Sequence, residues 1–388
     1  MKLLRRTWAN VDLDSIEKNY RAIRKHVPEQ AKILGIVKAD AYGHGAVPVS
    51  RALGEFGADY LAVSSLEEAM QLRRADIKMP LLILGYTPPQ YASDLAYLRL
   101  TQEVHTIEYA RALNLQLAGT GRILDVHVKI DTGMTRLGFD AREPEAFEAA
   151  FSELLKLSHL RVSGAFTHFS SADSLAPEDV AYTKTQYALF CDALDRMEAL
   201  GCRPEIRHCC NSGATILHPE FAMDMVRPGI ILYGEHPSED TKPYLSLEPA
   251  MSLHTLVSQI REVKAGTAVS YGRTFITPED RKIAVLSIGY ADGISRSLSG
   301  NLSFSIGGKL IPQVGRICMD MCMADATGAD ISVGDEATVF GASPALTAQE
   351  LAARTGTIVY ETLCIIGKRV PRIYFKGGSE TDTLQYVG

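Results

Sequence analysis

Long apolar runs, basic blocks and a signal-peptide pattern are all missing from this 388-residue chain. No apolar stretch approaches the ~18 residues that a membrane-spanning helix needs. The first residues, MKLLRRTWANVDLD, lack the apolar core of a signal peptide. Basic residues form no stripe, and the formal net charge is -6. We therefore expect a globular protein that binds neither nucleic acid nor membrane.

Cysteine is scarce and irregularly spaced. The seven cysteines are an odd number, and their spacing does not resemble a disulfide framework. Cys318 and Cys322 are four residues apart, but no second Cys or His pair has the spacing of a zinc site. We predict reduced thiols, no metal centre and a cytoplasmic location.

Short β-branched runs alternate with longer amphipathic stretches from residue 12 to about residue 240. This alternation predicts parallel strands joined by right-handed crossovers, and the number of runs matches a (β/α)8 barrel, the TIM barrel. The competing fold is an open doubly wound sheet, which usually carries GxGxxG after its first strand, and that motif is absent. The predicted strands are 33–39, 60–64, 81–85, 101–106, 123–130, 162–169, 205–210 and 221–226.

The rhythm changes after about residue 245. Runs at 252–263, 281–291, 309–326 and 335–341 have the composition of strands and are mostly separated by Gly, Pro, Asp and Asn. Only 346–355 has a helical pattern there. We predict a barrel domain over 1–245 and a smaller, mainly β domain over 246–388.

Polar residues follow the ends of the predicted barrel strands, which is where barrel enzymes carry their chemistry. Loops after the seventh and eighth strands of such barrels often bind phosphate, and a lysine across the mouth could form a Schiff base with an aldehyde. Together these features favour pyridoxal phosphate as cofactor. The residues are Lys38, Lys129, Arg136, His168, Asn211, Ser212, Arg227, Gly229 and Ile230.

Each of these residues also has a structural interpretation. A strand-end lysine is usually solvated, and a single histidine is more often hydrogen-bonded within the fold. Ser212 alone is typical of a helix N-cap, and Arg227 alone of a surface ion pair. Tyr271 alone is typical of a half-buried tyrosine with a satisfied hydroxyl. The joint arrangement, rather than any one residue, favours an active site.

The segment VKADAYGHGA (37–46) resembles the lysine motif that binds pyridoxal phosphate in the alanine racemase family. Further segments resemble the same family in the same order, from about residue 8 to about residue 375. The family fold is a barrel plus a β domain. These segments are HVKIDTGMTRLGF (127–139), THFSSAD (167–173), CNSGAT (210–215), VRPGIILYG (226–234), SYGRTF (270–275), LSIGYADG (286–293), VGRICMDM (314–321) and VYETLC (359–364).

The resemblance implies a two-base reaction. Lys38 would hold the cofactor and act as one base, and Tyr271, supplied by the partner subunit of a homodimer, would act as the other. In the family a hydrogen-bond chain runs from this tyrosine to His168 and on to Arg227. Arg227 would face the pyridine nitrogen, to which an arginine donates a hydrogen bond without giving up its proton.

The resemblance also implies the remaining contacts. The phosphate would be held by Tyr42, Ser212, Gly229, Ile230 and Tyr360, with Asn211 also in the cofactor site. Arg136 and the Met319 backbone N–H would bind the substrate carboxylate, and Tyr290 and Asp320 would line the substrate entrance. Lys129 matches a lysine that is often carbamylated in the family. One departure is Asp40, where many relatives have Asn.

The implied activity is interconversion of L- and D-alanine, which supplies D-alanine for peptidoglycan. A serine or broad-specificity racemase is the nearest alternative. In serine racemases the position of Tyr360 tends to be Asn, and those proteins usually carry a membrane domain. A basic amino-acid decarboxylase would place Glu opposite the pyridine nitrogen instead of Arg227. A non-catalytic pyridoxal-phosphate carrier would lack residues 246–388.

Overall fold

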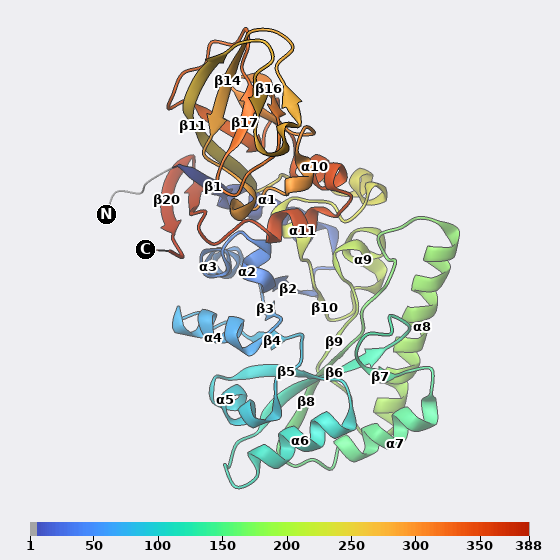
Figure 1. Cartoon of the computed structure of the whole chain (residues 1–388). Helices are drawn as coiled ribbons and strands as arrows, with labels where there is room; N and C mark the ends of the chain where they lie inside the picture. The colour runs from blue at the N-terminus through green and yellow to red at the C-terminus, as the bar shows by residue number, and fades with distance from the viewer. Residues whose placement is uncertain (1–5, 388) are drawn as a thin grey trace. The chain divides into compact units, whose positions relative to one another are not determined.

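The computed structural model describes residues 6–387, which divide into two compact units (Figure 1). The barrel unit comprises residues 16–41 and 46–248. Among the described residues, the β unit comprises 6–15, 42–45 and 249–387. The division is therefore not a single cut of the chain, because both the N-terminal segment and residues 42–45 group with the β unit.

The barrel unit is built on parallel strands in the order β10-β2-β3-β4-β5-β6-β8-β9. Backbone hydrogen bonds from Asp224 to Arg207 (3.1 Å) and from Arg227 to Cys210 (3.0 Å) join the last strand to the first and close the ring. The predicted (β/α)8 barrel is thus confirmed. The strands are β2 Lys32–Ile36, β3 Tyr60–Val63, β4 Leu81–Ile83, β5 Leu100–Val104, β6 Leu124–Asp131, β8 Leu160–Phe166, β9 Ile206–His208 and β10 Met225–Val226, with β7 Phe139–Asp140 paired to β6.

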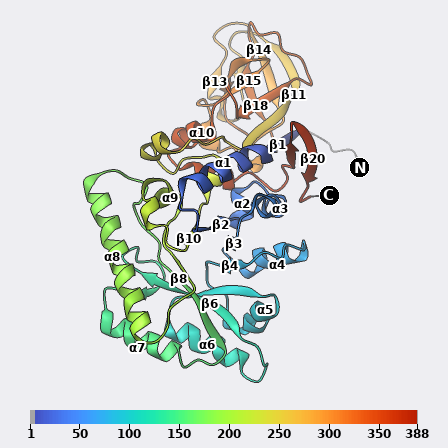
Figure 2. The same ribbon diagram turned by 180° about the vertical axis from the view of Figure 1, so that it is seen from behind.

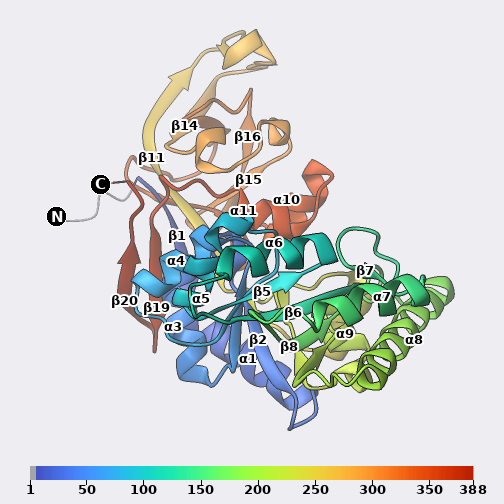
Figure 3. The same ribbon diagram turned by 90° about the horizontal axis from the view of Figure 1, so that it is seen from below.

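Helices of the barrel unit surround these strands (Figures 2 and 3). Helices cover the outer face of the barrel and packed side chains fill its interior. The strands are therefore buried on both faces and consist of nearly continuous apolar residues, as in β4. Local signals set the helix limits: Ser65 caps α4 by accepting from the Glu68 N–H. The helices are α1 Leu13–His26, α3 Ala46–Phe56, α4 Leu66–Arg74, α5 Ala92–Tyr97, α6 Ile107–Leu117, α7 Pro144–Leu154, α8 Pro177–Ala199 and α9 Ser212–Leu217, in addition to the short α2 Lys38–Tyr42.

The β unit contains a closed ring of mostly antiparallel strands in the order β11-β14-β17-β16-β15-β18, with β18 returning to β11. Strands β1, β19 and β20 extend the sheet from β11. The predicted mainly β architecture is confirmed. Its elements are β1 Thr7–Asp12, β11 Met251–Val263, β12 Ala268–Val269, β13 Phe275–Ile276, β14 Arg281–Leu286, β15 Ser303–Ile306, β16 Lys309–Val314, β17 Cys322–Asp325, β18 Glu336–Phe340, β19 Arg372–Lys376, β20 Ser379–Leu384, α10 Ala348–Thr355 and α11 Val359–Cys364.

Several local predictions in the β unit were wrong. The run 309–326 is two strands, because Gly315 takes a φ of 70° and opens a loop between β16 and β17. The segment 359–364 is a helix, although only 346–355 was predicted to be helical. It was not predicted because its six residues, which include β-branched and aromatic ones, show no helical period. The strand at 7–12 was not predicted at all; it depends on pairing with distant β11 and β19.

Two further properties bear on the sequence predictions. Among residues 6–387, no helix combines the length and apolar character needed to cross a bilayer. All seven cysteines are free thiols, and Cys209, Cys210 and Cys322 are buried.

Candidate functional site

Lys38 follows β2 and begins a short turn of left-handed helix. Ala39, Asp40 and Ala41 have φ angles of 50°, 55° and 54°, and Tyr42 continues at 52°. Left-handed geometry costs an L-residue roughly 1–2 kcal/mol. Such strain persists only where the surroundings enforce it, and it concentrates at functional sites.

Two carboxylates hold this turn within the barrel unit. The Ala39 N–H donates to Oε1 of Glu68 (2.7 Å), and the Ala46 N–H donates to Oδ1 of Asp40 (2.7 Å). Asp40 therefore has a structural role, which Asn could also fill, because Asn tolerates left-handed geometry and offers the same acceptor. The backbone after Lys38 is fixed by contacts that no local sequence pattern predicts.

Cationic groups gather around His168 at the ends of the barrel strands. The pKa of His168 is held well below its ordinary value by burial and by the charges of Lys129, Arg227, Arg136 and Lys38. Lys129 and Arg227 are only 7% and 3% exposed. Within residues 6–387, neither lies within 4.0 Å of a carboxylate oxygen. The buried guanidinium of Arg227, which has no counter-ion there, favours an anionic ligand.

Arg227 is fixed by its surroundings. Its Nη2 donates to the carbonyl oxygens of Thr167 (2.7 Å) and Cys209 (3.0 Å) and lies 3.3 Å from Nδ1 of His168. Its Nη1 donates to Nδ1 of His208 (3.0 Å). The guanidinium group is thereby held in one orientation beside His168.

The loops after β9 and β10 meet beside this cluster. The Gly229 N–H donates to Oγ of Ser212 (2.9 Å), which ties the start of α9 to the segment before the 3-10 turn Ile230–Tyr233. Asn211, rather than Ser212, is the N-cap of α9, since its side chain accepts from the Ala214 N–H (3.0 Å). The Ser212 hydroxyl can still donate a hydrogen bond of its own.

In the β unit, Tyr42 and Tyr360 are brought together with ring centroids 5.9 Å apart. The left-handed φ of Gly43 (81°) and its closeness to α11 both require glycine, because a Cβ there would lie 2.3 Å from the Leu363 carbonyl oxygen. Tyr374 donates to the carbonyl of His44 (2.8 Å). Burial and Tyr360 raise the pKa of Tyr42, so its hydroxyl remains a donor.

The other predicted residues of the β unit are exposed. Tyr290, Met319 and Tyr271 are 41%, 52% and 69% exposed. Tyr290 is next to the Cys318–Met319 segment, because its N–H donates to the carbonyl of Cys318 (3.0 Å). Asp320 forms an ion pair with Arg369 (2.7 Å). Tyr271 begins a 3-10 turn (Tyr271–Arg273) on the surface.

Both units match known protein families. The N-terminal domain model of alanine racemase matches residues 11–237, and the C-terminal domain model matches residues 250–374. The chain belongs to the alanine racemase family. It is 42% identical over 387 residues to Alanine racemase 2 of Caldanaerobacter subterraneus, covering 99% of this chain and 98% of the relative. It is 44% identical to the alanine racemase of Desulfovibrio desulfuricans, with 95% and 98% covered.

Solved alanine racemase structures are similar over the whole chain. The Clostridium difficile 630 enzyme has a TM-score of 0.95 at 39% identity, with 100% of each chain covered. The Bacillus anthracis enzyme with bound L-Ala-P has a TM-score of 0.93 at 35% identity, covering 100% of this chain and 99% of that one.

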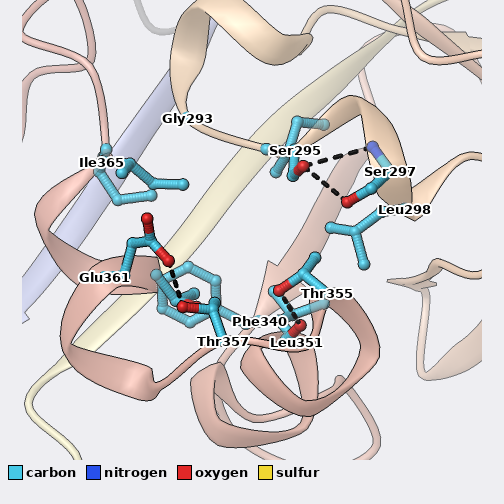
Figure 4. Close-up of a pocket in the computed structure, with 13 residues that line it drawn as sticks. Gly293, Ser295, Ser297, Leu298, Phe340, Leu351, Thr355, Thr357, Glu361 and Ile365 are labelled. Atoms are coloured by element: carbon cyan, nitrogen blue, oxygen red, sulfur yellow. Dashed lines mark hydrogen bonds between the residues drawn. The ribbon is translucent and has the colours of Figure 1, made fainter.

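This alanine racemase family member also has a cavity whose lining differs from the predicted site residues. The cavity, of about 160 Å³, lies in the β unit between the segment after Gly293 and helices α10 and α11 (Figure 4). Ser295 and Ser297 face each other on one side, and Thr357 and Glu361 are hydrogen-bonded on the other. Among the described residues, its lining includes none of those predicted to bind cofactor or substrate.

Buried titratable residues of the barrel unit that sequence analysis did not single out include His127 on β6, His208 on β9 and Glu235. His127 lies between Val126 and Val128 on the buried strand β6, and a polar residue in such a strand was an available signal. Glu235 follows the 3-10 turn Ile230–Tyr233, and its N–H donates to the carbonyl of Ile230 (3.3 Å). Burial raises its pKa to about 7, although Lys242 opposes the shift.

Glu235 gives the protein a pH-dependent stability. Because its folded-state pKa lies above the unfolded value of 4.5, its contribution is complete below pH 4.5 and is lost as the pH rises through about 7. We expect Glu235→Gln to have a free energy of unfolding up to about 3 kcal/mol higher than wild type at pH 8, measured by urea denaturation. At pH 4.5 the variant should show no such gain. Exposed Glu239→Gln is the control. An equal gain at both pH values would show that this carboxyl does not titrate on folding.

Proposed function

We propose that this protein interconverts L- and D-alanine with pyridoxal phosphate as cofactor and so supplies D-alanine for peptidoglycan. The observation that carries the proposal is the cluster of Lys38, Lys129, Arg136 and Arg227 around a neutral His168 at the strand ends of the barrel. The named relatives act on alanine, as their names state. We also propose a cytoplasmic location, which the free thiols support.

The residues present fit pyridoxal phosphate. Lys38 would carry the cofactor, and Arg227 would donate to its pyridine nitrogen. The phosphate would be held by Ser212, Gly229, Ile230, Tyr42 and Tyr360, with Asn211 supporting Ser212 from the cap of α9. When bound, the cofactor withdraws electrons from the α carbon of an amino acid and so acidifies its C–H bond.

The chain would supply two bases and a carboxylate site. Lys38 and Tyr271 would act on opposite faces of the α carbon, one removing the proton while the other returns one. Neutral His168, held by Arg227, would connect to the tyrosine hydroxyl. Arg136 and the Met319 N–H would hold the substrate carboxylate, while Tyr290 and Asp320 would narrow the entrance.

We further propose a homodimer with shared sites. Tyr271 is 69% exposed on the β unit, whereas a base works best where water is excluded. A partner subunit that covers this surface would provide the exclusion. We also propose the division of labour that the sequence suggests. Residues 1–245 carry the cofactor site, to which Tyr360 adds one phosphate contact, and residues 246–388 supply the second base.

Chiral chromatography tests the function directly. Purified protein with added pyridoxal phosphate is incubated separately with L-alanine and L-serine. We expect alanine to become racemic quickly and serine slowly, because the bulk of Tyr360 leaves little room for a hydroxymethyl group; such small differences are worth only ~1–3 kcal/mol. Faster serine conversion would favour the serine alternative. No conversion of either by protein that binds the cofactor would favour the carrier or the decarboxylase.

Lys129 is proposed to be carbamylated. Burial and the charges of Arg227 and Arg136 lower its pKa well below the ordinary value, so its amine is available to react with carbon dioxide. The resulting anion would orient Arg136. We expect wild-type protein in ¹³C-bicarbonate to show a carbamate ¹³C signal that Lys129→Met lacks. The same variant should lose about 10–100-fold in kcat/KM, the value of a hydrogen bond to a charged group.

Exposed Lys156→Met is the matched control for Lys129→Met and should keep both signal and activity. A carbamate signal that survives in Lys129→Met would assign the modification to another amine. If Lys129→Met lacks the carbamate signal but keeps full activity, Lys129 does not contribute to substrate binding through Arg136.

A further inference from the structure

Arg227 is backed by two buried histidines, His208 and His127, which we call the histidine pair. Arg227 Nη1 lies 3.0 Å from Nδ1 of His208, and His208 Nε2 lies 2.9 Å from Nδ1 of His127. His208 and His127 are 0% and 1% exposed. Neither was predicted to be a site residue.

The proton positions in this chain follow from one fact: an arginine side chain only donates. Nδ1 of His208 must therefore accept, so a neutral His208 carries its proton on Nε2. That proton is donated to Nδ1 of His127, which consequently carries its own proton on Nε2. The opposite direction is excluded, because it would place two N–H groups against each other between Arg227 and His208.

Both rings are neutral. Burial, opposed by Asp125, lowers the pKa of His127 to about 3. Burial and the charge of Arg227 lower the pKa of His208 well below its ordinary value. A protonated His208 could not accept from Arg227, so neutrality and the direction of the chain support each other.

Packing fixes the rings as well. Phe166 stacks on His208 with centroids 4.9 Å apart and planes 2° from parallel, and its ring also lies under the guanidinium of Arg227 (5.5 Å). The far ring, His127, lies against Gly164 of the neighbouring strand β8. A Cβ at residue 164 would lie 2.5 Å from Nε2 of His127 and 2.6 Å from two of its ring carbons. Gly164 thus provides the space that His127 occupies.

We propose that His127, seated on Gly164, is a positioning residue that acts through His208 to fix the donor direction of Arg227 toward the bound ring nitrogen. The effect on the cofactor rests on the proposed function; the proton arrangement does not. Both hydrogens of Nη2 and one hydrogen of Nη1 on Arg227 already have acceptors. The Nε–H and the second Nη1–H remain, and the described residues provide no acceptor for them. A rigid histidine pair would hold the guanidinium in the orientation in which these two donors point toward a ligand.

The first test is ¹⁵N NMR of histidine-labelled protein, with His208 and His127 assigned by substitution. We expect both rings to hold the proton on Nε2 and to remain neutral from pH 5 to pH 9 (roughly the range in which an ordinary histidine titrates). A proton on Nδ1 of His208, or titration of either ring, would overturn the proposal. This test needs neither cofactor nor activity, so its failure is distinct from failure of the proposed function.

The second test measures the dissociation constant for pyridoxal phosphate. His127→Phe removes the acceptor for His208 at similar volume, and Gly164→Ala displaces the ring. We expect either change to weaken binding about 10-fold, as for loss of a buried hydrogen bond. Ser163→Ala, on the same strand, should have no effect. In an Arg227→Lys background, His127→Phe should cause no further loss, because its effect passes through Arg227.

A full additional loss from His127→Phe in the Arg227→Lys background would overturn the proposal, since it would mean that His127 acts only on general stability. Unchanged binding in both Gly164→Ala and His127→Phe would overturn it too. If one variant fails to fold, the other and the wild-type NMR measurement still decide the matter.

Discussion

Replacing Lys38 with alanine is expected to lower alanine racemisation by at least ~10⁴-fold, the upper value for loss of a general base. The loss has two causes, because the same amine would hold the cofactor and move a proton. Borohydride reduction followed by peptide mass spectrometry should attach the cofactor to the peptide containing residue 38 in wild type and to no peptide in Lys38→Ala.

Lys32→Ala is the matched control, since Lys32 lies at the opposite end of the same strand β2 and is exposed. It should retain both cofactor attachment and activity. If Lys38→Ala racemises alanine as fast as Lys32→Ala, the amine at position 38 is not the base. Lys38→Arg keeps a positive charge without a reactive amine, and it should be as inactive as Lys38→Ala.

Removing only the hydroxyl of Tyr271, with Tyr271→Phe, is expected to lower racemisation about 10³–10⁴-fold. Cofactor attachment should be unchanged, because the tyrosine lies on the β unit and is proposed to contact the substrate alone. In deuterium oxide, one enantiomer of alanine should still exchange its α hydrogen without racemising, since Lys38 still serves one face. Exchange of neither enantiomer, or of both, would contradict the assignment of one base to each face.

Tyr244→Phe, which changes an exposed tyrosine of the barrel unit, is the control and should retain full activity.

Mixing the two inactive variants tests whether the active site is shared between subunits. Subunits carrying Lys38→Ala and subunits carrying Tyr271→Phe, unfolded and refolded together, should regain part of the activity, because one of the two sites in each mixed dimer is intact. No recovery in demonstrated mixed dimers would mean that both bases come from one chain.

Local periodicity was enough to predict most of the fold. Runs such as 81–85 are apolar because helices cover the outside of the barrel and packed side chains fill its interior. Strand β1 was not predicted because its six residues have no strong period of their own. It becomes a strand by pairing with residues more than two hundred positions away.

The sequence by itself determined the two-part architecture, the gathering of cations at the strand ends and the family, because each depends on residue types and their order along the chain. The tertiary structure alone decided the left-handed turn after Lys38, the pairing of Tyr42 with Tyr360, and the chain from Arg227 through His208 to His127 against Gly164. These features depend on contacts between segments that only folding brings together. A residue's neighbours across strands, and therefore its protonation and orientation, are not encoded in its local pattern.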